Sequence, residues 1–176
     1  MTSPDISSKL VEAASAAGWK SEDVKILDNH ALDRNQCKFF RAVHKRRMDG
    51  ATLELATLPD GRVVGGDPSQ GDSSAAASIL SQCGNDSPAE WWAEVVARFS
   101  GKAAGRVVKS ERDAYDIGEI EKRGGHFAPP VLERSGDATH LQFFGIQYEP
   151  NRPFKVSATL SKHGDLVVTS EPLGAN

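Results

Sequence analysis

The chain has 176 residues and a formal net charge of −3, with 39% hydrophobic and 26% charged residues. A chain of this length and composition can bury a sizeable core without a metal or a disulfide, so we expect one compact domain spanning residues 1–176. No stretch approaches the roughly 18 consecutive apolar residues that a membrane-spanning helix needs. The N-terminal sequence resembles neither a secretory signal nor a transit peptide, so we expect a cytoplasmic protein unless a leader was removed.

One helix followed by a meander of strands is predicted in the first part of the chain. Residues 4–17 predict the helix, because Ser3 can cap it, Pro4 suits its first position and apolar residues recur along one face. Aromatic, β-branched or alternating residues then predict strands at 24–27, 36–47, 51–58 and 62–64. Asp49-Gly50 predicts a tight hairpin turn between the second and the third of these strands.

Two helices are predicted in the middle of the chain, after a loop at 65–74. The first, at about 73–83, ends at Gly84. The second follows a capping box at 87–90, in which proline suits the first helical position. Its apolar side chains line one face at helical spacing. They are Trp91, Trp92, Val95, Val96 and Phe99.

The last part of the chain is again rich in predicted strands. A short strand is predicted at 106–108 and a helix is favoured at 111–122, whereas residues 122–137 are rich in turn formers and stay unassigned. Three further strands, separated by turns, are predicted at 139–148, 154–160 and 165–169.

Two stretches of the chain follow the same order of strands and turns. A shift of 103 positions lays residues 39–64 on residues 142–167. It pairs Phe40 with Phe143, Leu53 with Val156, and Gly61 with Gly164. Each half then reads as a helix, a short strand and a three-stranded meander. A duplication with halves at 1–68 and 85–173 is therefore one interpretation, and a single undivided unit is the other.

The order of elements predicts the fold class. It resembles that of cystatin-like and PepSY-like modules, in which one helix packs on an antiparallel meander. The resemblance concerns architecture alone, since the chain lacks the glutamine-valine-glycine loop of the protease-inhibiting cystatins. We therefore expect an α+β fold with an antiparallel sheet and helices packed on one face.

A run of basic residues is the first candidate for binding. Residues 34–47 carry six basic groups and no acid. Phe39 and Phe40 lie within the run, and a sheet that presents aromatics and cations can stack nucleic-acid bases. However, the pI near 6.0 is too low for a dedicated nucleic-acid binder. An acidic protein partner suits the run better. Its expected contacts are Arg41, Lys45, Arg46 and Arg47.

Two adjacent tryptophans are the second candidate for partner binding. Trp91 and Trp92 lie about 100° apart on the predicted helix, so they cannot both face the core equally. Packing of both indoles against the sheet is one interpretation. An exposed indole would instead mark a partner site, because tryptophan is favoured at binding hot spots.

The two cysteines, Cys37 and Cys83, cannot form a zinc site alone. In a cytoplasmic chain we expect free thiols, although a disulfide between them stays open. Cys83, with His126 and His140, is the candidate nucleophile of a thiol-dependent enzyme. However, Cys83 follows a predicted helix, where the helix dipole disfavours a thiolate, and a small buried apolar residue is the alternative.

Motifs for other chemistries are absent or better explained otherwise. The GDSS sequence at 71–74 suits a helix N-cap, and the acids at 111–121 alternate with bases as in a solvated segment. There is no HExxH, Walker or GxGxxG motif, so we expect no metal and no cofactor.

The function that we expect is that of a non-enzymatic protein-binding or regulatory module, such as an inhibitor or an immunity-type protein. The alternatives are a small thiol-dependent enzyme and a weak nucleic-acid binder. We expect no membrane partner, and a homodimer stays open.

Overall fold

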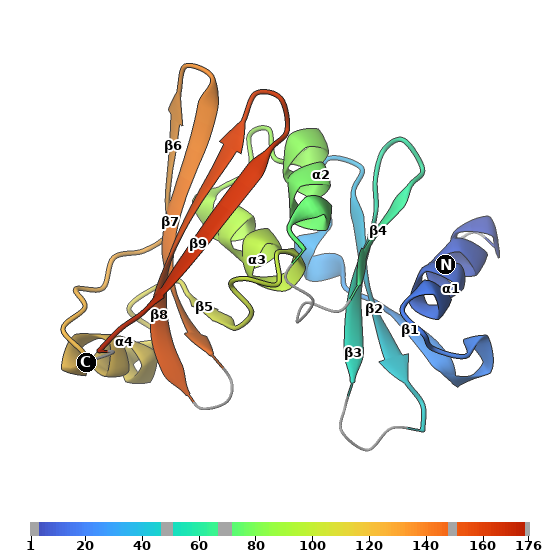
Figure 1. Ribbon diagram of the computed structural model, residues 1–176, viewed down its shortest axis with the longest axis horizontal. Coiled ribbons are helices and arrows are strands. Elements are labelled where there is room, and N and C mark those ends of the chain that lie inside the picture. The colour runs from blue at the N-terminus through green and yellow to red at the C-terminus, as the bar shows by residue number, and fades with distance from the viewer. Residues whose placement is uncertain (1–3, 47–50, 67–71, 148–150, 175–176) are drawn as a thin grey trace.

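The chain has an α+β fold, as the sequence predicted, in a computed structural model that describes residues 4–46, 51–66, 72–147 and 151–174. Within these residues there are four α-helices and two antiparallel sheets (Figure 1). The helices are α1 (Pro4–Ala16), α2 (Ser74–Cys83), α3 (Ala89–Phe99) and α4 (Ala114–Lys122), with two short 3-10 helices, η1 (Ser21–Asp23) and η2 (His30–Leu32).

The N-terminal sheet has four strands in the order β1-β2-β3-β4. They are β1 (Val24–Asp28), β2 (Lys38–His44), β3 (Thr52–Thr57) and β4 (Val63–Gly66). All three pairings are antiparallel, so the strands form the meander that the sequence predicted. The Asp49-Gly50 turn predicted between β2 and β3 lies outside the described residues.

The C-terminal sheet has five strands and is also antiparallel throughout. They are β5 (Arg106–Val108), β6 (Val131–Ser135), β7 (Ala138–Gln147), β8 (Arg152–Ser161) and β9 (Leu166–Pro172). The order is β5-β7-β8-β9, and β6 pairs with β7 beyond the stretch that β5 occupies. The two sheets are separate, whereas the sequence had not distinguished one sheet from two.

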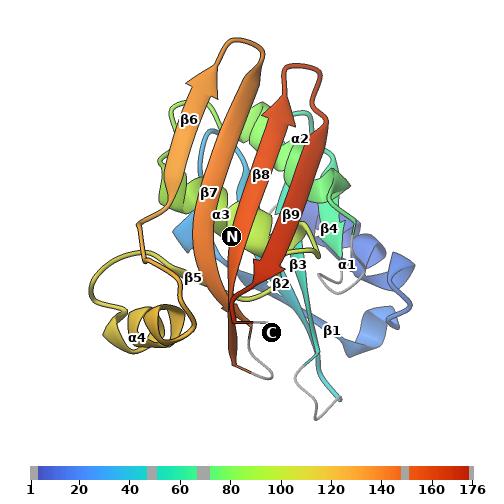
Figure 2. The ribbon, with the colours of Figure 1, turned by 60° about the vertical axis from the view of Figure 1, so that its left-hand side comes forward.

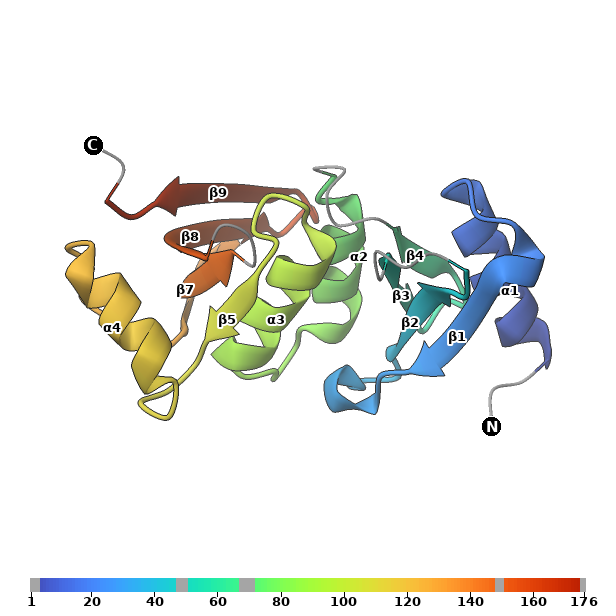
Figure 3. The same ribbon diagram turned by 90° about the horizontal axis from the view of Figure 1, so that it is seen from below.

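The helices and sheets alternate in layers, as Figure 3 shows. Helix α1 lies on the outer face of the N-terminal sheet, α2 and α3 lie between the two sheets, and α4 lies beyond the C-terminal sheet. The N-terminal sheet therefore has helices on both faces. The C-terminal sheet has α2 and α3 on its inner face, and only α4, at one end, on its outer face.

The side chains of β2 alternate between the two faces of the N-terminal sheet, so this one strand contributes to the core on each side. Phe39 and Phe40 are neighbours on β2, so their side chains point to opposite faces. Phe39 belongs to the central core and contacts the rings of Trp91 and Phe99 edge-on. Phe40 belongs instead to the cluster beneath α1. A single strand thus joins two cores, which gives its aromatic pair a structural role.

Strand β6 is the element that the sequence did not predict. It pairs with β7 through Val131–Ser135, and the hairpin between them turns at Gly136, which has a φ of +54°. Val131 is 45% exposed, and most other β6 side chains are also exposed. An exposed edge strand carries little apolar alternation, so its sequence lacks the usual strand signal.

The predicted duplication remains a prediction. Gly61 and Gly164, which the shift of 103 positions pairs, have φ values of +81° and +87°. Only glycine adopts this left-handed backbone without strain, so both turns need a glycine for the same local reason. Turn chemistry alone accounts for this match, with or without a duplication.

Candidate functional site

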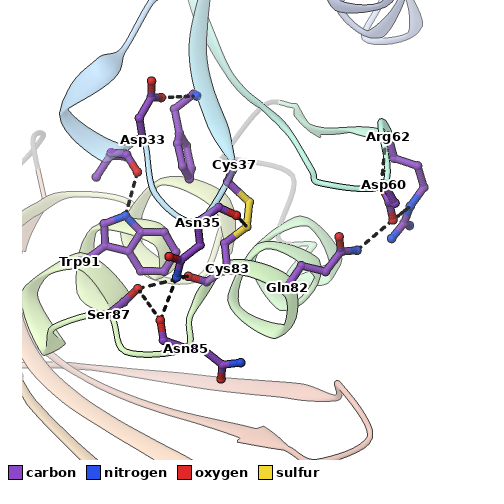
Figure 4. The surroundings of a disulfide bond; sticks show 12 residues. Asp33, Asn35, Cys37, Asp60, Arg62, Gln82, Cys83, Asn85, Ser87 and Trp91 are labelled. Atoms are coloured by element: carbon purple, nitrogen blue, oxygen red, sulfur yellow. Dashed lines mark hydrogen bonds and ion pairs between the residues drawn. A yellow bond between two sulfur atoms is a disulfide. The ribbon is translucent and has the colours of Figure 1, made fainter.

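The two cysteines form a disulfide, which corrects the expectation of free thiols. Cys37, at the start of β2, is bonded to Cys83, at the end of α2, across 46 residues of sequence (Figure 4). Both residues are fully buried. The pair joins the N-terminal sheet to the helix layer, and no thiol remains on Cys83 to act as a nucleophile.

A tight turn before Cys37 is fastened to the same helix end. Asn35 adopts a positive φ of 47°, which asparagine tolerates better than most residues. Its Nδ2 donates hydrogen bonds to the carbonyl oxygens of Cys83, at 2.9 Å, and Asn85, at 2.8 Å. Figure 4 shows this clamp beside the disulfide. The junction is therefore a structural connection between the N-terminal sheet and the helix layer.

The candidate histidines are not brought to Cys83. His140 lies on the exposed outer face of β7, where its Nδ1 is 3.1 Å from Thr159 Oγ1. Its neighbour Leu141 faces the central core, as Phe143 does, so His140 points to the other side of β7. His126 is exposed in the segment between α4 and β6. The thiol-enzyme constellation of Cys83, His126 and His140 is thus not assembled.

Both tryptophans of α3 are buried, so they are core residues rather than partner contacts. Trp91 and Trp92 are 7% and 4% exposed. Each indole also has a hydrogen-bond acceptor, since Trp91 Nε1 donates to the Leu32 carbonyl and Trp92 Nε1 to the Gly84 carbonyl. Helix α3 can bury two adjacent indoles because it lies between two sheets, a position that the sequence pattern does not reveal.

The cations of the predicted basic run each contact a different partner from elsewhere in the chain. Arg41 pairs with Glu54 at 2.6 Å, and Arg46 pairs with Asp23 at 2.9 Å. Lys45 Nζ donates to the Glu22 carbonyl at 2.9 Å. Arg47 lies outside the described residues. The run is therefore not one continuous patch, and its members point to different neighbours.

Arg41 nevertheless leads to a charged groove between the layers. A groove of about 430 Å³ is lined by residues of β2 and β3, of α3, and of β5 with the two residues before it. Its charged lining residues are Arg41, Glu54, Glu94, Arg98 and Arg106. Only Arg41 among them was a candidate from the sequence.

The carboxylates of this groove are less exposed to solvent than the cations that pair with them. The Glu54 side chain is 9% exposed, whereas its partner Arg41 is 42% exposed. The Glu94 side chain is 14% exposed, whereas Lys109, 2.5 Å from it, is 44% exposed. Arg98 bridges the two acids, at 3.7 Å from Glu54 and 2.9 Å from Glu94.

Arg106 repeats this arrangement at the rim. Its guanidinium makes two hydrogen bonds to Asp116 of α4, at 2.9 and 2.5 Å. Asp116 is 9% exposed, and Arg106 is 48% exposed. The buried member of each pair is thus an acid, so the charges that meet solvent in the groove are mainly cationic.

The cations keep Glu94 ionised despite its burial. Burial alone raises the pKa of this carboxyl, but hydrogen bonds from Lys109 and Arg98 outweigh that effect and hold the pKa below its ordinary value. A neutral Glu94 would leave Lys109 and Arg98 without their main partner. Glu94 therefore keeps its negative charge at neutral pH.

An exposed row of side chains continues the groove toward the sheet edge. Leu27 of β1 lies opposite Arg41 of β2, and Lys25 lies opposite Val43. Because Leu27 and Lys25 alternate with Ile26, which packs under α1, both face the inner side of the sheet. Leu27 is 39% exposed, one of the few large apolar side chains on the surface of the described residues. We call Lys25, Leu27 and Arg41 the inner row.

Sequence reasoning missed most of this site. The Glu94–Arg98 spacing of four residues on one helix is a signal that could have been found. Lys25 and Leu27 carry no such signal, since a short apolar strand flanked by a lysine is common in any sheet. Their exposure depends on β1 being an edge strand.

Neither the described part of the chain nor the comparisons with known proteins add a chemical clue to the site. The described residues contain no group of three or more His, Cys, Asp or Glu side chains that could hold a metal ion. None of their helices is long and apolar enough to cross a membrane. No protein-family model, curated protein or solved structure matches the chain.

Proposed function

We propose that the chain is a non-enzymatic module that binds an acidic segment of another protein along the inner row and the groove beside it. The observation that carries this proposal is the difference in exposure within the ion pairs. The carboxylates are mostly buried, whereas the cations paired with them are about half exposed. A carboxylate of a partner would meet guanidinium and ammonium groups first. Such complementarity speeds association and selects the partner by its charge.

The surroundings of the cations favour a protein over a small ligand. Leu27 is an exposed aliphatic side chain directly beside Arg41, so the surface combines apolar and charged contacts. Protein interfaces typically place arginine next to apolar residues in this way. The buried disulfide removes the nucleophile of the thiol-enzyme alternative, which lowers the support for that reading.

The disulfide also supports an oxidising compartment as the place of action, in place of the cytoplasm that the sequence suggested. Disulfides persist outside the cytosol and are rare within it, where thiols are kept reduced. Alkylation of free thiols in intact cells before lysis tests this inference. We expect Cys37 and Cys83 to stay unmodified, and alkylation of both would contradict it.

Binding of a defined acidic probe tests the proposed function. We expect a fluorescein-labelled poly-glutamate peptide to bind the folded chain with an affinity that falls as salt rises. Lys25→Glu should weaken this binding by about tenfold or more. The matched control is Lys155→Glu, a charge reversal on the outer face of the C-terminal sheet, which should leave the affinity within about twofold.

Two outcomes would count against the proposal. Equal losses in Lys25→Glu and Lys155→Glu would show that only the net charge matters. Tighter binding of a single-stranded DNA oligonucleotide than of the peptide, with the same sensitivity to Lys25→Glu, would favour the nucleic-acid alternative.

A further inference from the structure

Strand β1 is one of the two edge strands of the N-terminal sheet, and β4 is the other. Strand β1 pairs with β2 along all five of its residues, and no strand of the described residues pairs with its other side. Figure 3 shows β1 along the border of the sheet. The 3-10 helices η1 and η2 flank it, so the open stretch has defined ends. Such an edge presents unpaired backbone groups to any extended chain.

The hydrogen-bond ladder identifies the unpaired groups. Asn29 N donates to Phe39 O at 2.8 Å, and Lys45 N donates to Asp23 O at 2.8 Å. In an antiparallel pair, hydrogen-bonded positions recur at every second residue. Lys25 and Leu27 are therefore bonded to β2. The N–H and C=O groups of the alternate residues Ile26 and Asp28 point away from the sheet, whereas the Val24 N–H donates to the Ser21 carbonyl at the end of η1.

The inner row distinguishes this edge from the others. Strands β4 and β5 are edge strands too, but neither carries an exposed large apolar side chain among its described residues. Strands β6 and β9 are also edge strands, and each carries an exposed valine, Val131 or Val167. On those strands, residues two or four positions away on the same face are acids, Glu133 and Glu171. On β1 the exposed Leu27 lies beside the cations Lys25 and Arg41. Only this edge, among those of the described strands, combines open backbone groups with an apolar residue between cations.

We infer that β1 binds its partner by strand addition, so that an extended acidic segment becomes a fifth strand of the N-terminal sheet. This inference rests on the proposed function and specifies how the partner binds. Backbone hydrogen bonds to Ile26 and Asp28 supply affinity, and alternate side chains supply specificity. The segment carries an acidic residue opposite Lys25 and an aliphatic residue opposite Leu27, two positions apart.

The test uses a short synthetic peptide, Thr-Glu-Thr-Val-Thr-Glu-Thr, whose row of Glu, Val and Glu matches the inner row in either strand direction. We expect it to bind the full chain, measured by fluorescence anisotropy. A peptide of the same composition with both glutamates adjacent should bind about tenfold more weakly, because one shifted residue faces the other side of the sheet.

Backbone methylation makes the test specific for strand addition. N-methylation of a central threonine and N-methylation of the valine remove amide protons that point in opposite directions. We expect one of the two to weaken binding by about tenfold or more and the other to leave it within about threefold. The threonine is the sensitive position in antiparallel addition and the valine in parallel addition.

The failures of the two proposals are distinguishable. Equal effects of the two methyl groups, with binding still lost in Lys25→Glu, would overturn strand addition and leave an acidic partner bound through side chains. No binding of the peptide, with poly-glutamate still bound, would overturn it in the same way. Self-association of the chain that disappears in Leu27→Thr would overturn it in favour of a second copy as the occupant of the edge.

Discussion

The two sheets of this chain expose different parts of themselves. The N-terminal sheet is covered on both faces, by α1 outside and by α2 and α3 inside, and leaves an edge and one short row of side chains in solvent. The C-terminal sheet leaves most of its outer face bare over β6–β9, as Figure 2 shows. That face presents polar residues such as His140, Gln142 and Thr169.

The difference shows that, when helices cover both faces of a sheet, an edge strand is the main surface that it can still offer to a partner. An antiparallel sheet with one wet face alternates apolar and polar side chains, and its polar face needs no partner. A sheet with both faces covered has few surface positions left, so an exposed Leu27 between two cations stands out. Our proposal therefore puts the binding site on the N-terminal sheet, although the C-terminal sheet has the larger open surface.

Removing the disulfide that joins the N-terminal sheet to α2 should have the largest effect on stability. The double change Cys37→Ala with Cys83→Ala opens a loop of 46 residues and should lower the free energy of unfolding by about 4 kcal/mol. Urea denaturation of the oxidised protein and the variant measures the difference. Dithiothreitol should destabilise the wild type by a similar amount and leave the variant unchanged. A loss below about 1 kcal/mol would contradict this role.

The outer faces of the two sheets should differ in their tolerance to truncation. Leu55 is fully buried beneath α1, so Leu55→Ala should cost about 3 kcal/mol through lost burial and a cavity. Gln142 is exposed on the outer face of the C-terminal sheet, so Gln142→Ala should change stability by less than about 0.5 kcal/mol. Similar costs in thermal or urea unfolding would show that the faces are not distinct.

The Glu94 carboxylate of the groove should make stability depend on pH. Since the folded state lowers the pKa of Glu94 below its ordinary value of 4.5, the carboxylate contributes stability above that value, which is lost as the pH falls through the lowered pKa. Glu94→Gln should cost about 2 kcal/mol near neutral pH and flatten the acid side of the stability profile.

Urea midpoints measured from neutral to acidic pH check this prediction. Glu133→Gln, at an exposed carboxylate of the C-terminal sheet, is the matched control and should keep the wild-type slope. A profile of Glu94→Gln that runs parallel to the wild type would show that the groove's cations do not depend on this carboxylate.

Changes on the two edge strands β1 and β9 should have the smallest effects on stability. Only the change on β1 should weaken peptide binding. Leu27 and Val167 are 39% and 63% exposed, so Leu27→Thr and Val167→Thr should each change stability by less than about 0.5 kcal/mol. Only Leu27→Thr should weaken binding of the Thr-Glu-Thr-Val-Thr-Glu-Thr peptide, by about fivefold in anisotropy titrations. An equal loss in Val167→Thr would place the binding edge on the other sheet or on both.

Local patterns predicted most elements of the fold. The strongly amphipathic α3 and the alternating strands β3 and β8 were expected close to where they lie. The predicted capping box of α3 is not formed, since Ser87 Oγ donates to the Cys83 carbonyl instead. The sequence patterns that predict these elements involve only residues that are close together in the chain. Strand β6 escaped prediction because it is exposed and borders the sheet, so no apolar period marks it.

The candidate site was much less predictable. Arg41 was expected as a partner contact, but its neighbours Lys25 and Leu27 on the inner row were not, and neither were the groove residues Glu54 and Arg98. The expected contacts Trp91 and Trp92 turned out to be buried. Whether an indole or a leucine meets solvent depends on which elements lie over it, and those elements are distant in sequence.

By itself, the sequence determined the α+β class, the order of helix and meander, and the turns at Gly61 and Gly164, because each follows from the chemistry of neighbouring residues. Only the tertiary structure decided that Cys37 meets Cys83, that buried acids divide the basic run, and that β1 is left as an open edge. These features depend on contacts between residues that are far apart in the chain, and no local period encodes such contacts.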